Sequence, residues 1–238
     1  MRRMWFLLFL FIFVGCAPSL QQSERRAASR STPEYVSYFP AETGATWEYL
    51  PSGARLSEPP VTVTIDGPTI VDETVATAWT TFGRGRVATH FRIHEGGAQY
   101  LWREYRPGVI IEFDPPLREF AAGTLTASSA WSGETTVRVY ADHMNETGGT
   151  TVGKELLQTY TVQYETSVVE TRRVNVPFGG VDVFVLSHVA EHQNDAGEIL
   201  DRVSKLTWFS PHLGEVRSGD GLLLTSTNVP HSTTGEGE

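Results

Sequence analysis

Apolar and polar residues alternate with a period of two along much of the chain. Residues 160–169 place tyrosine and valine on one face and threonine, glutamine and glutamate on the other. This alternation is typical of a β-strand with one buried and one wet face. Residues 61–65 repeat the pattern, whereas residues 181–186 are apolar on nearly both faces and predict a central, well-covered strand.

The remaining apolar runs predict a chain of short strands separated by turns. Gly96-Gly97 fits a tight hairpin, and residues 194–197 and 218–221 fit slightly longer ones. A short helix is predicted only around 154–157, and a longer excursion around 145–149. We therefore expect an all-β fold, an antiparallel meander of about ten strands forming a curved sheet, a sandwich, or a barrel or half-barrel. The other predicted strands are 46–50, 71–81, 87–94, 99–105, 109–113, 135–140, 199–209, 215–217 and 222–227.

The N-terminus has the two physical features of an export signal. Arg2 and Arg3 precede an unbroken apolar run over residues 5–14. The run is too short for a membrane-spanning helix, which needs about 20 apolar residues. It ends in Phe13-Val14-Gly15-Cys16, which resembles the lipobox of bacterial lipoproteins.

This resemblance implies that the Cys16 thiol receives a lipid and that residues 1–15 are removed as a signal peptide. Cys16 is the only cysteine, so it has no disulfide partner, and acylation would consume an otherwise reactive exported thiol. In that family an Asp after the cysteine often retains the protein at the inner membrane. Ala17 occupies that place and favours the outer membrane. The alternative is an ordinary secretory signal that contains a cysteine by chance.

Composition divides the remaining chain into a tether, one domain and a tail. Residues 16–35 are polar and without apolar periodicity, and predict a lipidated flexible tether. Residues 36–227 are long enough for a single β-rich domain with its own core, and residues 228–238 predict a disordered tail. Without the signal, 17 basic and 28 acidic residues give a formal charge of −11, which argues against nucleic acid as a partner.

A second resemblance covers most of the predicted domain. Tyr38-Phe39-Pro40 and the segment 44–49, Gly-Ala-Thr-Trp-Glu-Tyr, resemble the opening of uncharacterised bacterial envelope proteins. Their later motifs are similar to residues 115–117, 131–133 and 208–216 here. The resemblance implies a fold and no activity. We expect the motif tryptophans Trp47, Trp131 and Trp208 to plug the open ends of the sheet.

The motifs that suggest catalysis or metal binding lack the local structure that each of these functions requires. His188 and His192 belong to an H-x-x-E-H pattern, which binds zinc only on a helix. On the predicted strand they would lie about 13 Å apart, at about 3.3 Å per residue, and His90 and His94 repeat this spacing. Residues 83–88 match G-x-G-x-x-A but precede a strand, so they predict a hairpin with Arg84 and Arg86 at its tip.

Glu112 and Asp114 are two residues apart on a strand, where they could face one cavity or remain solvated edge charges. We therefore assign no catalytic residue, no cofactor and no metal site. The sequence favours a membrane-anchored envelope lipoprotein that binds or carries a hydrophobic ligand. The alternative is a structural or assembly lipoprotein docked onto an envelope protein complex, and a hydrolase ranks last.

The lipobox makes a direct prediction. Cys16→Ser should abolish lipidation and release the protein from membranes, because the acyl chains are the anchor. Fractionation of cells with metabolic labelling of lipid measures both effects. Unchanged association of the variant with membranes would refute the assignment of Cys16.

Overall fold

The fold is a chain of twelve β-strands, seen in a computed structural model that describes residues 39–40, 42–142 and 154–230. The described residues lie within the unit Tyr35–Glu238. The strands are β1 (Thr46–Pro51), β2 (Val61–Val71), β3 (Thr74–Gly83), β4 (Arg86–Glu95), β5 (Ala98–Arg106), β6 (Val109–Phe120), β7 (Ala130–Asp142), β8 (Lys154–Val176), β9 (Gly179–Gln193), β10 (Ile199–Ser210), β11 (Gly214–Arg217) and β12 (Leu222–Thr227).

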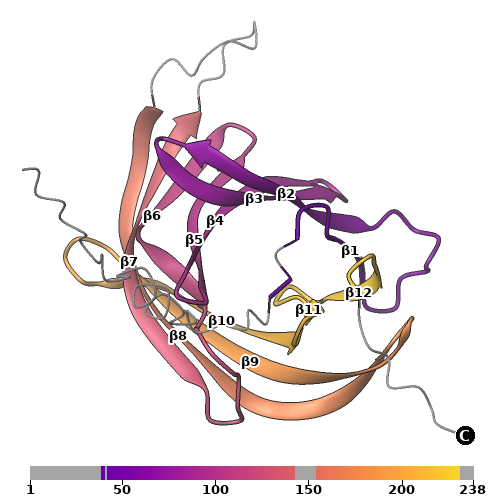
Figure 1. The fold of residues 1–238 in the computed structure, drawn as a ribbon. Coiled ribbons are helices and arrows are strands. Elements are labelled where there is room, and N and C mark those ends of the chain that lie inside the picture. Colours follow the sequence, from indigo (N-terminus) through magenta and orange to yellow (C-terminus); the bar gives the residue numbers. More distant parts are fainter. Residues whose placement is uncertain (1–38, 41, 143–153, 231–238) are drawn as a thin grey trace, which may run out of the picture. The chain divides into compact units, whose positions relative to one another are not determined.

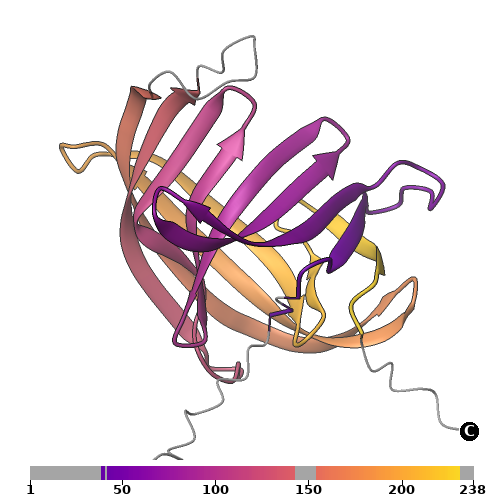
Figure 2. The same cartoon turned by 45° about the horizontal axis from the view of Figure 1, so that its top comes forward.

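Each strand pairs with its neighbours in sequence, and the first strand closes on the last. β1 pairs antiparallel with both β2 and β12, so the meander forms a closed barrel (Figures 1 and 2). The all-β antiparallel fold is confirmed, and the closure is a barrel. No helix among the described residues is long and apolar enough to cross a membrane.

The wall of this barrel is uneven. β8 and β9 contain 23 and 15 residues, whereas β1, β11 and β12 contain 6, 4 and 6 and lie together on one side (Figure 1). β10 pairs with β9 from Ile199 to Phe209 but with β11 only from Trp208 to Ser210. Within the part of the chain that the structure describes, the other edge of residues 199–207 has no strand partner. Residues 199–206 are all exposed.

Two details of the predicted elements are wrong. Residues 154–157 form no helix but begin β8, where Lys154 pairs with Asp142 and Leu156 with Tyr140. Ladder bonds along β7 override the weak local helical preference. Residues 71–81 are not one strand, because the chain reverses between β2 and β3.

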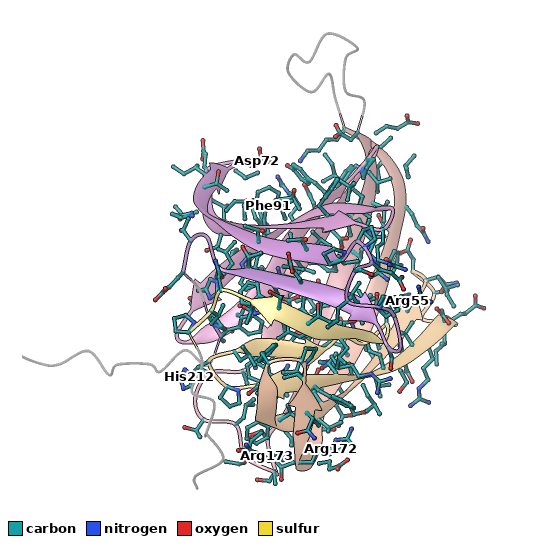
Figure 3. The ribbon with its side chains drawn as sticks, turned by 90° about the vertical axis from the view of Figure 1, so that its right-hand side faces the viewer. Arg55, Asp72, Phe91, Arg172, Arg173 and His212 are labelled. Carbon is teal, nitrogen blue, oxygen red and sulfur yellow. The ribbon has the colours of Figure 1, made fainter. Side chains whose placement is uncertain are left out.

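The reversal occurs at Asp72 and Glu73, whose φ angles are 45° and 65°. A type I′ hairpin turn has positive φ at both central positions, which Asn and Gly usually provide. Here two acidic residues adopt it, so the usual sequence signal is missing. Asp72 is stabilised by Arg103 on β5, at 2.8 Å. Figure 3 shows Asp72 at the top of the view and Arg172 and Arg173 at the bottom.

The largest buried side chain in the core is Trp47 of β1, which is 1% exposed. Its ring stacks on Trp79 of β3 at 5.4 Å, and its Nε1 donates a 2.7 Å hydrogen bond to the Leu213 carbonyl. Leu213 lies in the turn between β10 and β11, so the Trp47 side chain connects β1 to this turn. Gly214 is required beside it, because its φ is +99° and a Cβ there would lie 3.3 Å from Trp47 Nε1.

The other motif tryptophans have different roles. Trp131 is buried with Leu186 and Phe209 in a second core cluster. Trp208 is only partly buried and lies between the guanidinium groups of Arg172 and Arg217, 4.4 and 4.9 Å from its ring. Trp47 and Trp131 therefore contribute to the core, and Trp208 forms a cation–π stack.

Replacement of Trp47 tests its role in closing the barrel. Trp47→Ala should lower the free energy of unfolding by about 3–5 kcal/mol, because it leaves a cavity and an unpaired carbonyl. Trp47→Phe should cost less, since it removes mainly the hydrogen bond. Denaturant unfolding measures both. Leu56→Ala, at a side chain that is 70% exposed, is the matched control and should change stability by less than about 0.5 kcal/mol. Equal stability of all three variants would contradict this role.

Candidate functional site

The barrel interior contains a cavity of about 290 Å³. It is lined by residues of β4, β5, β6, β8, β9, β10 and β11 and by Phe39, which precedes β1. A second cavity of about 240 Å³ shares Phe39, Arg92 and Glu215 with the first. These three residues therefore stand where the two cavities meet.

One wall of the larger cavity is aromatic. The ring of Phe39 lies 5.0 Å from Phe120 and 5.4 Å from Phe209, and these last two are 4.4 Å apart. Leu101 and Leu117 extend this wall. Such a surface suits the apolar part of a small molecule.

A satisfied ion pair forms part of the polar wall. Arg92 of β4 donates to both carboxylate oxygens of Glu119 at 2.6 and 3.1 Å, and Gln99 Nε2 adds a 3.1 Å bond to Glu119 Oε2. Burial alone would raise the pKa of Glu119, but the charge and hydrogen bonds of Arg92 outweigh it and hold the pKa below its ordinary value. Gln99 is 3% exposed, and its Oε1 has no hydrogen-bond partner among the described residues.

His188 is held neutral between two hydroxyl groups. Its Nδ1 lies 3.0 Å from Thr166 Oγ1 on β8, and its Nε2 lies 2.8 Å from Thr207 Oγ1 on β10. Burial, followed by the charge of Lys205, lowers the pKa of His188 to about 4. Both ring nitrogens are engaged in hydrogen bonds, so this imidazole links β8 and β10 across the cavity wall and is not free to act on a ligand.

Glu215 of β11 is a carboxylate without a direct partner. It lines both cavities, yet its carboxylate makes no hydrogen bond or ion pair within the described chain. Burial raises the pKa of Glu215 to about 7; Lys205 and Arg92 oppose this rise, whereas Glu119 and Asp220 add to it. A partly buried group with a strongly shifted pKa in a cavity is a candidate for function.

Like Arg118 and Glu165 of the same cavity, Lys205 of β10 is a charged group without an ion-pair partner in the described chain. It lines the larger cavity and forms no ion pair with any described residue. Its stem packs on the turn between β11 and β12, because a Cβ at Gly219 would lie 2.5 Å from Lys205 Cδ. Lys205 is exposed, so this side of the cavity is open to solvent.

Apart from Glu215, the charged groups around the smaller cavity are paired. Arg86 is bonded to Asp220, and His90 Nε2 lies 3.5 Å from Glu104. Burial would raise the pKa of Glu104, but hydrogen bonds from His90 and Arg106 lower it to about 2. Trp47 and Trp79 supply most of the aromatic surface here.

The structure separates the residues that sequence motifs had grouped. His188 and His192 lie on strand β9 as predicted, and His192 contacts the ring of Tyr160 at 5.3 Å. His90 and His94 lie on β4, and Arg84 is in the β3–β4 turn. No group of three or more His, Cys, Asp or Glu residues within the described ranges could hold a metal ion.

Glu112 and Asp114 do not form a paired acid site. Glu112 contacts Arg103 and Lys154 at 2.8 and 2.9 Å, whereas Asp114 contacts Arg138 at 3.1 Å. Cys16 and residues 145–149 lie outside the described residues, so their assignments remain predictions. Sequence reasoning missed Arg92, Glu119, Lys205 and Glu215, which come from four different strands and share no motif.

No family model and no curated protein matches this chain. Among solved structures, the chain is similar to a crystal structure of a candidate lipoprotein from Parabacteroides distasonis ATCC 8503, at 12% identity and a TM-score of 0.48. The match covers 82% of this chain and all of that one. What the cavity binds is therefore inferred from its own residues.

The raised pKa of Glu215 predicts a specific pH dependence of stability. Its pKa is raised in the folded state, so its contribution to stability is fully present below the unfolded pKa and is lost as the pH rises through about 7. Glu215→Gln should remove this loss and be more stable than the wild type by about 2–3 kcal/mol at pH 8, but not at pH 4.

Urea unfolding across pH 4–8 measures this difference. Glu58→Gln is the control, because the amide of Arg55 lowers the pKa of Glu58 and its contribution changes only in more acidic solution. A stability difference between Glu215→Gln and wild type that does not vary with pH would contradict the burial of an unpartnered carboxylate.

Proposed function

We propose that the protein is a lipoprotein of the bacterial envelope, anchored through Cys16, whose barrel binds a small amphipathic molecule in its interior. The lipobox-like residues 13–16 support the anchor, and Ala17 supports the outer membrane as its location. The cavity supports the binding role. A protein that carries its ligand close to a membrane is consistent with both the lipid anchor and the cavity.

One observation carries the choice of ligand. The same cavity is lined by the aromatic rings of Phe39, Phe120 and Phe209 and by charged groups that lack partners in the described chain. A purely apolar ligand would leave Glu215 buried against hydrocarbon, which is costly. A molecule with an apolar body and a polar head satisfies both walls, and this refines the hydrophobic ligand expected from sequence.

A second function is favoured by the exposed edge of β10. Ile199, Leu200 and Leu206 are 59, 55 and 53% exposed, beside an edge without a strand partner in the described chain. Exposed apolar edge strands are sites for pairing with another chain. This geometry suits an assembly lipoprotein that docks onto an envelope protein.

Hydrolysis ranks below both functions for a structural reason. Glu119 and Glu215 line one cavity, and the pKa of Glu119 is lowered whereas the pKa of Glu215 is raised. A general base and a general acid differ in this way. However, both oxygens of Glu119 are held by Arg92, and Gln99 adds a third bond. Glu119 is therefore not free to act as a second carboxylic group beside Glu215.

Filling the cavity tests the binding function. Native mass spectrometry of the full-length protein extracted from its own membrane should show a bound small molecule. Ala190→Trp, which places an indole in the cavity, should lose it by steric exclusion. Ser204→Trp is the control, because Ser204 is exposed on β10 outside the cavity and should retain the ligand.

An empty wild-type protein with a filled interior would overturn the binding function. If Leu200 crosslinked to an envelope protein in the same cells, that result would favour assembly instead.

A further inference from the structure

Several charged side chains that line the two cavities have a partner of opposite sign among the described residues. Arg92 is matched by Glu119, Arg86 by Asp220 and His90 by Glu104. Buried charges in proteins are normally paired in this way because desolvation is expensive. Against this background, the unmatched groups of the larger cavity indicate where a ligand completes the pairing.

Two of the unmatched groups accept hydrogen bonds. The Glu215 carboxylate has no direct partner in the described chain, and neither has Gln99 Oε1. Gln99 is nine-tenths buried or more, at 3% exposed, and its amide is oriented by the bond from Nε2 to Glu119. Both acceptors line the same cavity. Together they suit a group that carries several donors and a positive charge.

Lys205 is an unmatched group of the opposite sign. Lys205 lines this cavity from β10, and its charge lowers the pKa of Glu215, so the two side chains are close enough to interact. They nevertheless form no ion pair. The stem of Lys205 is held against Gly219, and Glu215 is fixed on β11 opposite Phe209. Both side chains line the same cavity, where a ligand can contact each of them.

We propose that this cavity binds a zwitterionic head group, with an ammonium at Glu215 and Gln99 Oε1 and an acidic group at Lys205. The proposal rests on the binding function proposed above and specifies its ligand. The apolar part of the molecule lies against Phe39, Phe120 and Phe209. Charge-assisted hydrogen bonds of this kind are about twice as strong as neutral ones, so both ends of the head group contribute to affinity.

Four amphiphiles with the same eight-carbon chain separate the contributions of charge. The probes are 2-aminooctanoic acid, which is zwitterionic, octylamine, octanoate and octan-1-ol. Isothermal titration calorimetry with the full-length protein at pH 8 measures each affinity. The zwitterion should bind at least about tenfold more tightly than any of the other three, a ratio that corresponds to about 1.4 kcal/mol.

Two variants test which side chain binds each charge of the zwitterion. Glu215→Gln should weaken the zwitterion and octylamine about tenfold and leave octanoate no weaker. Lys205→Met should weaken the zwitterion and octanoate and leave octylamine no weaker. Arg202→Gln is the control, since Arg202 lies on the same strand but pairs with Glu191, away from the larger cavity. It should change none of the affinities. Thermal unfolding establishes that each variant is folded.

The outcomes separate this inference from the function on which it rests. If octan-1-ol binds as tightly as the zwitterion, or if both charge variants bind all probes like the wild type, the zwitterionic head is wrong and the binding function stands. If none of the four amphiphiles binds, the zwitterionic head group and the binding function are both wrong. If the zwitterion is preferred and each variant weakens its own probe, the assignment holds.

Discussion

A closed barrel of twelve strands encloses more volume than side chains alone easily fill. About eight strands leave an interior just wide enough for packed side chains, and wider barrels admit ligands or water. Here tryptophans fill part of the interior, and Phe39 enters it from outside the strands. The remaining space forms the two adjoining cavities. Everything proposed about function depends on this incomplete filling.

Charges inside such a barrel must satisfy one another, and most of them do. The bidentate Arg92–Glu119 pair shows how completely a buried carboxylate can be matched, and it keeps the pKa of Glu119 low. Glu215, a short distance along the same interior, has no such partner and its pKa is raised to about 7. The cavity therefore contains one carboxylate whose charge is matched and one whose charge is not. This difference explains why an amphipathic ligand fits better than a purely apolar one.

The repeating pattern of the chain was sufficient to predict the fold class. Period-two alternation in residues 160–169 and turn residues such as Gly96-Gly97 correctly indicated antiparallel strands. Failures occurred where local signals were absent or weak. The Asp72-Glu73 hairpin has no Gly or Asn, and the helical tendency of residues 154–157 is overridden by pairing with β7.

The candidate site was beyond prediction for a different reason. Lys205 and Glu215 are ten residues apart in the chain, no motif points to a chemical role for either, and Arg92 and Glu119 come from other strands. Only the closure of the barrel brings them to one cavity. His188, in contrast, was noticed through its motif, and its strand position explains why it contacts Thr166 and Thr207 instead of a metal.

The central claim is that the interior of the barrel is a binding site for an amphipathic molecule. A crystal structure of the full-length protein purified from its own membrane tests this most directly. We predict continuous electron density in the larger cavity, with an apolar part against Phe209 and a polar end within hydrogen-bond distance of Glu215. Density for isolated water molecules alone, or side chains collapsed into the space, would contradict the account.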